Sequence, residues 1–155
     1  MTAPPRILLD CDPGIDDAFA LLCALKFTGL DAITTVSGNV SINNTTRNAR
    51  FIMELAGADV PVHRGASAPL EVDGVAADEI HGASGLGKLK TPESARPESN
   101  VGAVEAIIDY CAGGDATIVA TGPLTNIALA VRQDPTLPER IGHLFWMGGG
   151  TEGGN

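Results

Sequence analysis

Apolar and polar positions alternate along this chain in blocks of two kinds. Short apolar runs rich in aliphatic and β-branched residues predict strands, which we place at residues 6–10, 30–37, 60–63, 116–120 and 143–147. Longer segments with helical spacing or helix-favouring composition predict helices, at residues 16–27, 41–56, 101–111 and 123–132. Strands and helices in this order predict an α/β fold, in which an open, mainly parallel sheet is flanked by helices.

Two segments depart from the amphipathic pattern. Residues 16–27 are apolar on almost every face, which predicts a helix buried in the layer that covers the sheet. Residues 64–100 are rich in Gly, Pro, Ser and charge, and loops of this length are usually functional or mobile. We find no repeat and no second-domain boundary, so residues 1–155 are expected to form a single domain. Its last predicted strand has no helix after it, as in part of a longer fold.

The charge of the chain limits its partners. The net charge is −9, from 19 acidic and 10 basic residues without a basic cluster, which excludes nucleic acid and favours a small neutral substrate or a cation. The three cysteines lie in or beside apolar segments, which is typical of reduced core thiols. No signal peptide starts the chain, and no apolar stretch is long enough to cross a bilayer. The sequence thus predicts a soluble cytoplasmic protein without a membrane partner.

Four aspartates, Asp10, Asp12, Asp16 and Asp17, follow the first predicted strand within eight positions. In open α/β sheets, ligands bind beyond the carboxyl ends of the strands. Carboxylates packed this closely must be protonated, be solvated or share a cation. Helix capping could explain Asp16 and Asp17, where a helix begins. It does not explain Asp12, so we favour a metal site.

The ligands available in this cluster are oxygens, which indicates a hard cation, either Ca²⁺ or Mg²⁺. An EF-hand is excluded, because the twelfth position counted from Asp10 is Leu21 where a bidentate Glu is required. Asn39 follows the second predicted strand and Thr121 the fourth, so both are expected at the same edge. His81 lies in the glycine-rich stretch DEIHGASGLG, either as a lid residue over the pocket or as an ordinary loop histidine.

The stretch DCDPGIDDAFAL closely resembles the N-terminal signature of the inosine–uridine-preferring nucleoside hydrolases. The resemblance continues in family order through ITTVSGNVS, RNARFIMELAG, HGASGLG, ATGPLTNIALA and MGGGTEGGN, over nearly the whole chain. It implies a Rossmann-like nucleoside hydrolase fold, present here as the N-terminal part only. It also implies calcium-dependent hydrolysis of the N-glycosidic bond of ribonucleosides such as inosine or uridine, to give ribose and free base.

The resemblance assigns roles to individual positions. Calcium is expected on Asp12, on Asp17 as a bidentate ligand and on the backbone carbonyl of Thr121, with the sugar's 2′- and 3′-hydroxyls completing the coordination. Asp12 is also the expected general base for the attacking water. The expected substrate-binding positions are Asp16, Asn39, His81, Met147 and Asn155.

This chain departs from the family in length. Family members carry a C-terminal half that supplies a further calcium-binding aspartate, a Glu and an Asn for the ribose, and often a His for the leaving base. This chain ends at Asn155, so we expect weak or absent hydrolase activity, weak calcium affinity, and homo-oligomers only for a full-length form. Two alternatives remain: a Mg²⁺-dependent phosphohydrolase of haloacid dehalogenase type, which Pro13 and Gly14 disfavour, and a non-catalytic fragment.

Overall fold

The computed structural model describes residues 4–72, 74 and 77–150. Its strands are β1 (Arg6–Cys11), β2 (Gly29–Thr35), β3 (Val62–Arg64), β4 (Ala116–Ala120) and β5 (Ile141–Trp146). Its helices are α1 (Ile15–Phe27), α2 (Ile42–Leu55), α3 (Asp78–His81), α4 (Ala103–Tyr110) and α5 (Thr125–Gln133), with short 3₁₀ turns at Cys111–Gly113 and Leu137–Arg140. Every predicted strand and helix is present, and α3 is an additional helix within the predicted long loop.

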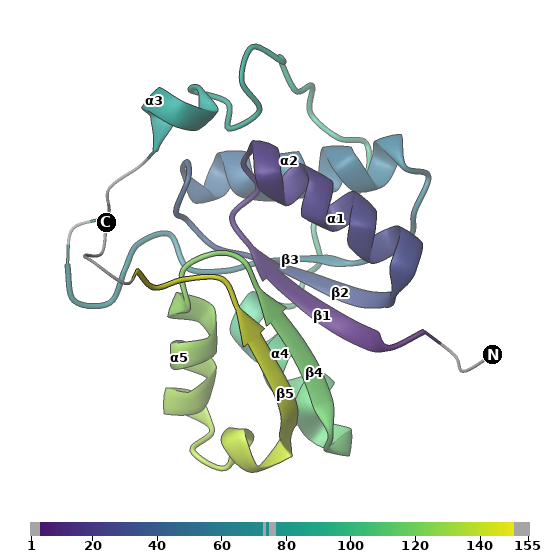
Figure 1. Ribbon diagram of the computed structural model, residues 1–155, viewed down its shortest axis with the longest axis vertical. Coiled ribbons are helices and arrows are strands. Elements are labelled where there is room, and N and C mark those ends of the chain that lie inside the picture. The colour runs from purple at the N-terminus through teal and green to yellow at the C-terminus, as the bar shows by residue number, and fades with distance from the viewer. Residues whose placement is uncertain (1–3, 73, 75–76, 151–155) are drawn as a thin grey trace.

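The five strands form one sheet in the order β3-β2-β1-β4-β5, and all neighbouring pairs are parallel. Helices α1 and α2 cover one face, and α4 and α5 cover the other (Figure 1). The predicted α/β fold with a parallel sheet is therefore confirmed. The connections run outward in opposite directions from β1 and β4, so these two strands flank the point where ligands bind in such sheets.

Each face of the sheet has its own apolar core. Leu8 and Leu9 are neighbours in β1 and point to opposite faces, because side chains alternate along a strand. Leu9 packs with Leu21 of α1, whereas Leu8 packs with Ile107 of α4. All four are almost fully buried. A central strand covered on both sides carries apolar residues at successive positions, as Ile7, Leu8 and Leu9 do in β1, and so it lacks the alternation of a half-exposed strand.

Helix α1 is buried along one stripe only. Leu21 and Ala24 face the sheet, but Phe19 is 67% exposed and Phe27 is 65% exposed. Helix α1 lies in the layer that covers the sheet, as expected, but its burial is limited to one side, because only that side meets the sheet and α2. The expectation of three core cysteines is wrong for the same reason, since Cys23 of α1 is exposed while the other two are buried.

In the part of the chain that the structure describes, strand β5 is the edge of the sheet and pairs with β4 alone. Phe145 lies beside Val119 on the face that carries α1 and is 57% exposed, and Trp146 is also exposed. Within the described residues no helix covers this part of that face (Figure 1). The expectation that the last strand lacks a covering helix is thus confirmed for residues 141–146.

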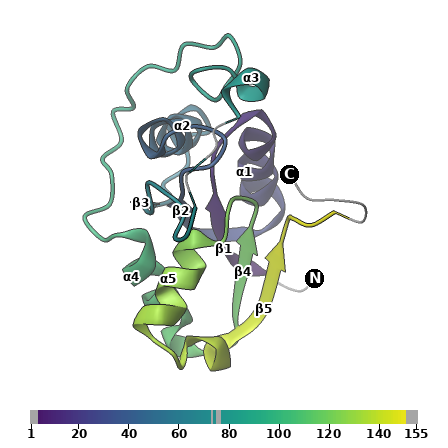
Figure 2. The ribbon, with the colours of Figure 1, turned by 90° about the vertical axis from the view of Figure 1, so that its left-hand side faces the viewer.

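The segment that follows α3 runs along the outer side of α2 before it reaches α4 (Figure 2). Polar side chains of α2 bind its backbone, beginning with Asn44, whose amide donates to the Ala83 carbonyl at 2.9 Å. The side chain of Arg50 donates to the carbonyls of Ser94 and Arg96. The predicted long loop is therefore fastened to a helix.

None of the helices in the described ranges is long and apolar enough to cross a membrane.

Candidate functional site

The candidate site lies where β1 and β4 end side by side. After β1 the chain turns through Asp12, Pro13 and Gly14 and enters α1, and we call residues 12–17 the aspartate turn. After β4, the N–H of Thr121 donates to the Asp10 carbonyl at 2.9 Å. The carboxyl ends of the two strands at the switch point of the sheet are thus joined directly, as predicted for a ligand site.

Four of the predicted site residues come together here. Asp12 is 5% exposed and Asp17 is 2% exposed. The backbone N–H of Asn39 donates to Oδ2 of Asp12 at 2.7 Å, and its Nδ2 donates to Oδ2 of Asp17 at 3.2 Å. The hydroxyl of Thr121 donates to Oδ1 of Asp17 at 2.5 Å. Residues far apart in sequence therefore fix the orientation of both carboxyl groups.

Burial disfavours the charged form of both carboxyl groups. Burial and, to a smaller extent, the charge of Asp17 raise the pKa of Asp12 to about 7, although the Asn39 N–H opposes the rise. Burial also raises the pKa of Asp17, against hydrogen bonds from Thr121 and Gly14. Among the described residues neither carboxyl has a cationic side chain as partner. A bound cation would favour the charged form of both groups.

The oxygen atoms of this site are of the kind that bind a hard cation, but they are too few to surround one. Buried carboxylate and carbonyl oxygens are the ligands that Ca²⁺ prefers, and it takes about six to eight of them. Over the described ranges, His, Cys, Asp and Glu form no group of three or more that could hold a metal ion. Asp12 and Asp17 therefore offer two carboxylates, which are fewer oxygen ligands than a Ca²⁺ ion takes.

Two glycines make room for Asp12. A Cβ atom at Gly38 would lie 2.1 Å from Oδ2 of Asp12, and one at Gly122 would lie 2.9 Å from its Oδ1. A side chain at either position would displace the carboxylate. Neither glycine was predicted from the sequence to have a role at the site. Their positions within three residues of the ends of β2 and β4 were the available signal, because glycine in or beside a strand often marks a close approach.

Asp10 lies inside the sheet and serves as a polar anchor. It is fully buried, and its Oδ1 accepts hydrogen bonds from the Thr34 hydroxyl at 2.5 Å and from Nδ2 of Asn126 at 2.8 Å. Asn126 also donates to the Thr35 carbonyl and accepts from the Ala66 N–H. Burial raises the pKa of Asp10 to about 6 despite these bonds. Asn126, which sequence reasoning missed, thus ties the ends of β1 and β2 to α5.

His81 ends α3 and rests on the start of α1. The N–H of Ile15 donates to its Nδ1 at 3.2 Å, and a Cβ atom at Gly14 would lie 2.5 Å from the same nitrogen. Oδ1 of Asp16 is 3.9 Å from Nδ1. Nδ1 of His81 thus accepts a hydrogen bond from the backbone of α1, and the Asp16 carboxylate lies near the same nitrogen. The structure therefore brings His81 to the aspartate turn, with Asp16 largely exposed beside it.

Two predicted sugar-site residues remain, Met147 and Asn155. The N–H of Met147 donates to the Ala120 carbonyl at 2.8 Å, which places Met147 next to Thr121, but Met147 is 61% exposed. Asn155 lies outside the described residues.

A cavity of about 470 Å³ opens beside Gly38, and its wall includes Ser41, Asn44, Ala83 and Pro123.

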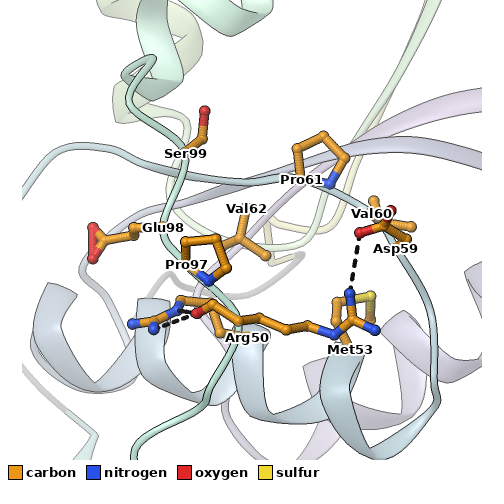
Figure 3. Close-up of a pocket in the computed structure, with 10 residues that line it drawn as sticks. Arg50, Met53, Asp59, Val60, Pro61, Val62, Pro97, Glu98 and Ser99 are labelled. Carbon is orange, nitrogen blue, oxygen red and sulfur yellow. Dashed lines mark hydrogen bonds and ion pairs between the residues drawn. The ribbon is translucent and has the colours of Figure 1, made fainter.

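A second cavity, of about 370 Å³, lies between α2 and the segment that returns toward α4, and it is lined by Arg50, Asp59, Val62, Pro97 and others (Figure 3). It meets β3 at the amino end of that strand, whereas the aspartate turn lies at the carboxyl ends. This cavity is therefore not part of the candidate site.

Comparison with known proteins identifies relatives of this chain. The family described as inosine-uridine preferring nucleoside hydrolase matches residues 7–155. The chain is 43% identical to the inosine-uridine preferring nucleoside hydrolase of Leishmania major, across 98% of this chain and 51% of that protein. It is 40% identical to uridine nucleosidase 1 of Arabidopsis thaliana, across 93% of this chain and 45% of that protein.

A solved structure, the plant nucleoside hydrolase PpNRh1 enzyme, matches with a TM-score of 0.89 and 40% identity, over 95% of this chain and 48% of that one. The chain spans about half the length of each of these relatives.

Proposed function

The chain belongs to the inosine-uridine preferring nucleoside hydrolase family, and we propose that it supplies calcium- and sugar-binding residues of a ribonucleoside hydrolase. The proposed reaction is hydrolysis of the N-glycosidic bond, which gives ribose and free base. One observation carries the proposal: Asp12 and Asp17 are buried together at the switch point of the sheet without a cationic partner among the described residues.

We propose that Ca²⁺ is held by the carboxylates of Asp12 and Asp17 and by the backbone carbonyl of Thr121. When bound, the ion would offset the charge of the two carboxylates and orient the hydroxyls of the sugar. The fixed contacts from Asn39 and from the Thr121 hydroxyl support this assignment, because they hold the carboxyl groups in place before any ligand arrives.

Asp12 is the proposed general base. Cleavage passes through an oxocarbenium-like sugar, and a water must attack it from the face opposite the base. A carboxylate held within hydrogen-bond reach of the attacking water can take its proton as the new bond forms. The Asn39 N–H fixes the direction of this carboxylate, which favours a single line of attack.

The proposed substrate is a neutral ribonucleoside such as inosine or uridine, which an acidic chain of net charge −9 repels less than it would a nucleotide. Relatives named for uridine and for inosine-uridine support this class. We propose that Asp16 and Asn39 contact ribose hydroxyls, that Met147 and Asn155 line the sugar site, and that His81 closes the site near the base.

We further propose that residues 1–155 are the N-terminal part of one cytoplasmic nucleoside hydrolase domain, which forms homo-oligomers in its full-length form. Weak or absent hydrolysis and weak calcium affinity are then expected of these 155 residues, because two carboxylates are few for calcium. The exposed side chains of Phe145 and Trp146 on β5 support the alternative of a non-catalytic fragment. The haloacid dehalogenase-type alternative finds no support, since the family match covers the aspartate turn itself.

Calcium titration by calorimetry tests the metal assignment. We expect Asp12→Ala and Asp17→Ala each to weaken binding at least tenfold relative to wild type, and Asp109→Ala, which removes an exposed aspartate of α4, to leave it unchanged. Equal calcium binding by all four proteins would contradict the proposal. Release of base from inosine and uridine, with p-nitrophenyl phosphate as the control substrate, separates a nucleoside hydrolase from a phosphohydrolase.

A further inference from the structure

We propose that Asn48 is a positioning residue that couples the loop carrying His81 to the aspartate turn, so that the two segments are held as one unit. We call residues 77–91 the His81 loop. The inference rests on the proposed function for its consequence at the sugar site, but the coupling itself is a property of the calcium-free chain.

Asn48 lies on α2 and is fully buried. Its Nδ2 donates to the carbonyl of Pro13 at 3.0 Å and to the carbonyl of Ser84 at 2.8 Å. Its Oδ1 accepts from the hydroxyl of Thr91 at 3.2 Å. Both amide hydrogens are thus used on two different segments, one in the aspartate turn and one in the His81 loop.

Gly85 allows the loop to approach this closely. Its φ is +86°, a conformation that favours glycine, and a Cβ atom there would lie 2.8 Å from Nδ2 of Asn48. The same Cβ atom would lie 3.1 Å from the Pro13 carbonyl oxygen. The loop, the amide of Asn48 and the aspartate turn therefore meet at one point, which any side chain at position 85 would force apart.

The remaining contacts close a ring of bonds through His81. The N–H of Gly87 donates to the His81 carbonyl at 2.7 Å, which folds the loop back on the end of α3. The N–H of Ile15 donates to Nδ1 of His81. Among the described residues Asn48 makes no side-chain hydrogen bond with His81, so a change at His81 on substitution of Asn48 must pass through the loop or the turn.

The chain offers a matched control on the same helix. Arg50 fastens the later part of the segment, since its Nε donates to the Arg96 carbonyl at 2.8 Å and its Nη2 to the Ser94 carbonyl at 3.1 Å. Neither of these bonds reaches the aspartate turn. Arg50→Met removes this fastening and keeps most of the aliphatic stem.

The test is nuclear magnetic resonance on the calcium-free 155-residue chain, with amide exchange and the ¹⁵N resonances of the His81 ring as readouts. In Asn48→Ala we expect at least tenfold faster exchange at the N–H groups of Ile15 and Gly87 and a shifted Nδ1 resonance. Arg50→Met is expected to leave all three as in wild type.

Gly85→Ala keeps the Asn48 amide and displaces the loop, so it should reproduce the changes seen in Asn48→Ala, and it serves if Asn48→Ala does not fold. The proposal is overturned if Gly87 exchanges faster in the folded variants while Ile15 and the Nδ1 resonance stay as in wild type. It is equally overturned if Arg50→Met shifts Nδ1 as much as the other variants do.

A calcium titration of the same proteins separates this inference from the proposed function. If wild type binds calcium, Asn48→Ala should bind it several-fold more weakly and Arg50→Met equally well. If wild type binds no calcium, the proposed function fails, and the exchange data still decide the coupling. Calcium binding that Asn48→Ala leaves unchanged counts against the coupling alone.

Discussion

Asn39 holds Asp12 at two atoms: its backbone N–H donates to Oδ2 of Asp12 at 2.7 Å, and its Nδ2 donates to the Asp12 carbonyl at 3.1 Å. The same Nδ2 also reaches Oδ2 of Asp17. A residue that follows β2 therefore sets the geometry of the turn that follows β1. Because the backbone bond does not depend on the side chain, the two contributions can be separated by mutation.

Asn39→Ala is expected to weaken calcium binding roughly tenfold, because it removes a hydrogen bond to the Asp17 carboxylate, and bonds to charged groups contribute about 1.5–3 kcal/mol. The Asn39 N–H remains, so the Asp12 carboxylate keeps its hydrogen bond, although the Asp12 carbonyl loses the bond from Nδ2. Calorimetric titration measures the effect, and Asn43→Ala, an exposed substitution on α2, is the control. An Asn39→Ala chain that binds calcium as wild type does would show that the amide plays no part in the site.

The calcium-free chain should lose stability as the pH rises from about 4 to about 7. The pKa of Asp12 is raised to about 7 and that of Asp10 to about 6, whereas an aspartate in the unfolded chain has a pKa of about 3.9. Between these values the folded state binds more protons than the unfolded state, so the free energy of unfolding falls with pH. Each such carboxyl contributes about 1.4 kcal/mol per pH unit inside its own window.

Urea unfolding in the presence of a chelator, at pH 5 and pH 7, measures this dependence. In Asp12→Asn the loss of stability over that range should be smaller, because one of the titrating groups is gone. Hydrogen bonds lower the pKa values of Glu54 and Asp134, so these groups lose their contribution to stability only at a pH below that range. A free energy of unfolding that increases from pH 5 to pH 7 is the result that contradicts the prediction.

Gly38→Ala should reduce calcium affinity at least tenfold. Its Cβ atom would lie 2.1 Å from Oδ2 of Asp12 and 2.9 Å from Cδ of Pro123, so the carboxylate must move from its hydrogen bond with Asn39. Overpacking of this kind also costs about 1–3 kcal/mol of stability. Gly113→Ala is the matched control, because a Cβ atom there meets nothing within 4 Å. Calorimetry and thermal unfolding of both variants would separate a local steric effect from a general effect of Gly→Ala.

Leu21→Ala and Phe19→Ala on α1 should differ sharply in stability. Leu21 is fully buried against β1, and truncation of such a leucine costs about 2–5 kcal/mol. Phe19 is 67% exposed, and substitutions at exposed positions usually stay within about 0.5 kcal/mol. Urea unfolding of the 155-residue chain measures both. Equal losses would mean that Phe19 is covered in solution, for example by a second copy of the chain, which sedimentation would then detect.

The order of strands and helices could be predicted from the sequence because it depends on local periodicity. Strand β4 was predicted with its observed bounds, and the other elements to within a few residues. The four residues of α3 were missed, since one turn of helix amid glycines has no period to detect. Which side of α1 is buried could not be predicted, because a helix that is apolar all round carries no sign of which side meets the sheet.

The sequence by itself determined the parallel α/β fold, the position of the aspartates after β1 and the family resemblance, because each of these follows from neighbouring residues. Only the tertiary structure decided that Asn39 and Thr121 bind Asp12 and Asp17, that Gly38 makes room for Asp12, and that Asn48 joins the His81 loop to the aspartate turn. These contacts link segments that are between 22 and 104 residues apart. Such pairings arise only once the crossovers of the sheet bring the strand ends to one edge.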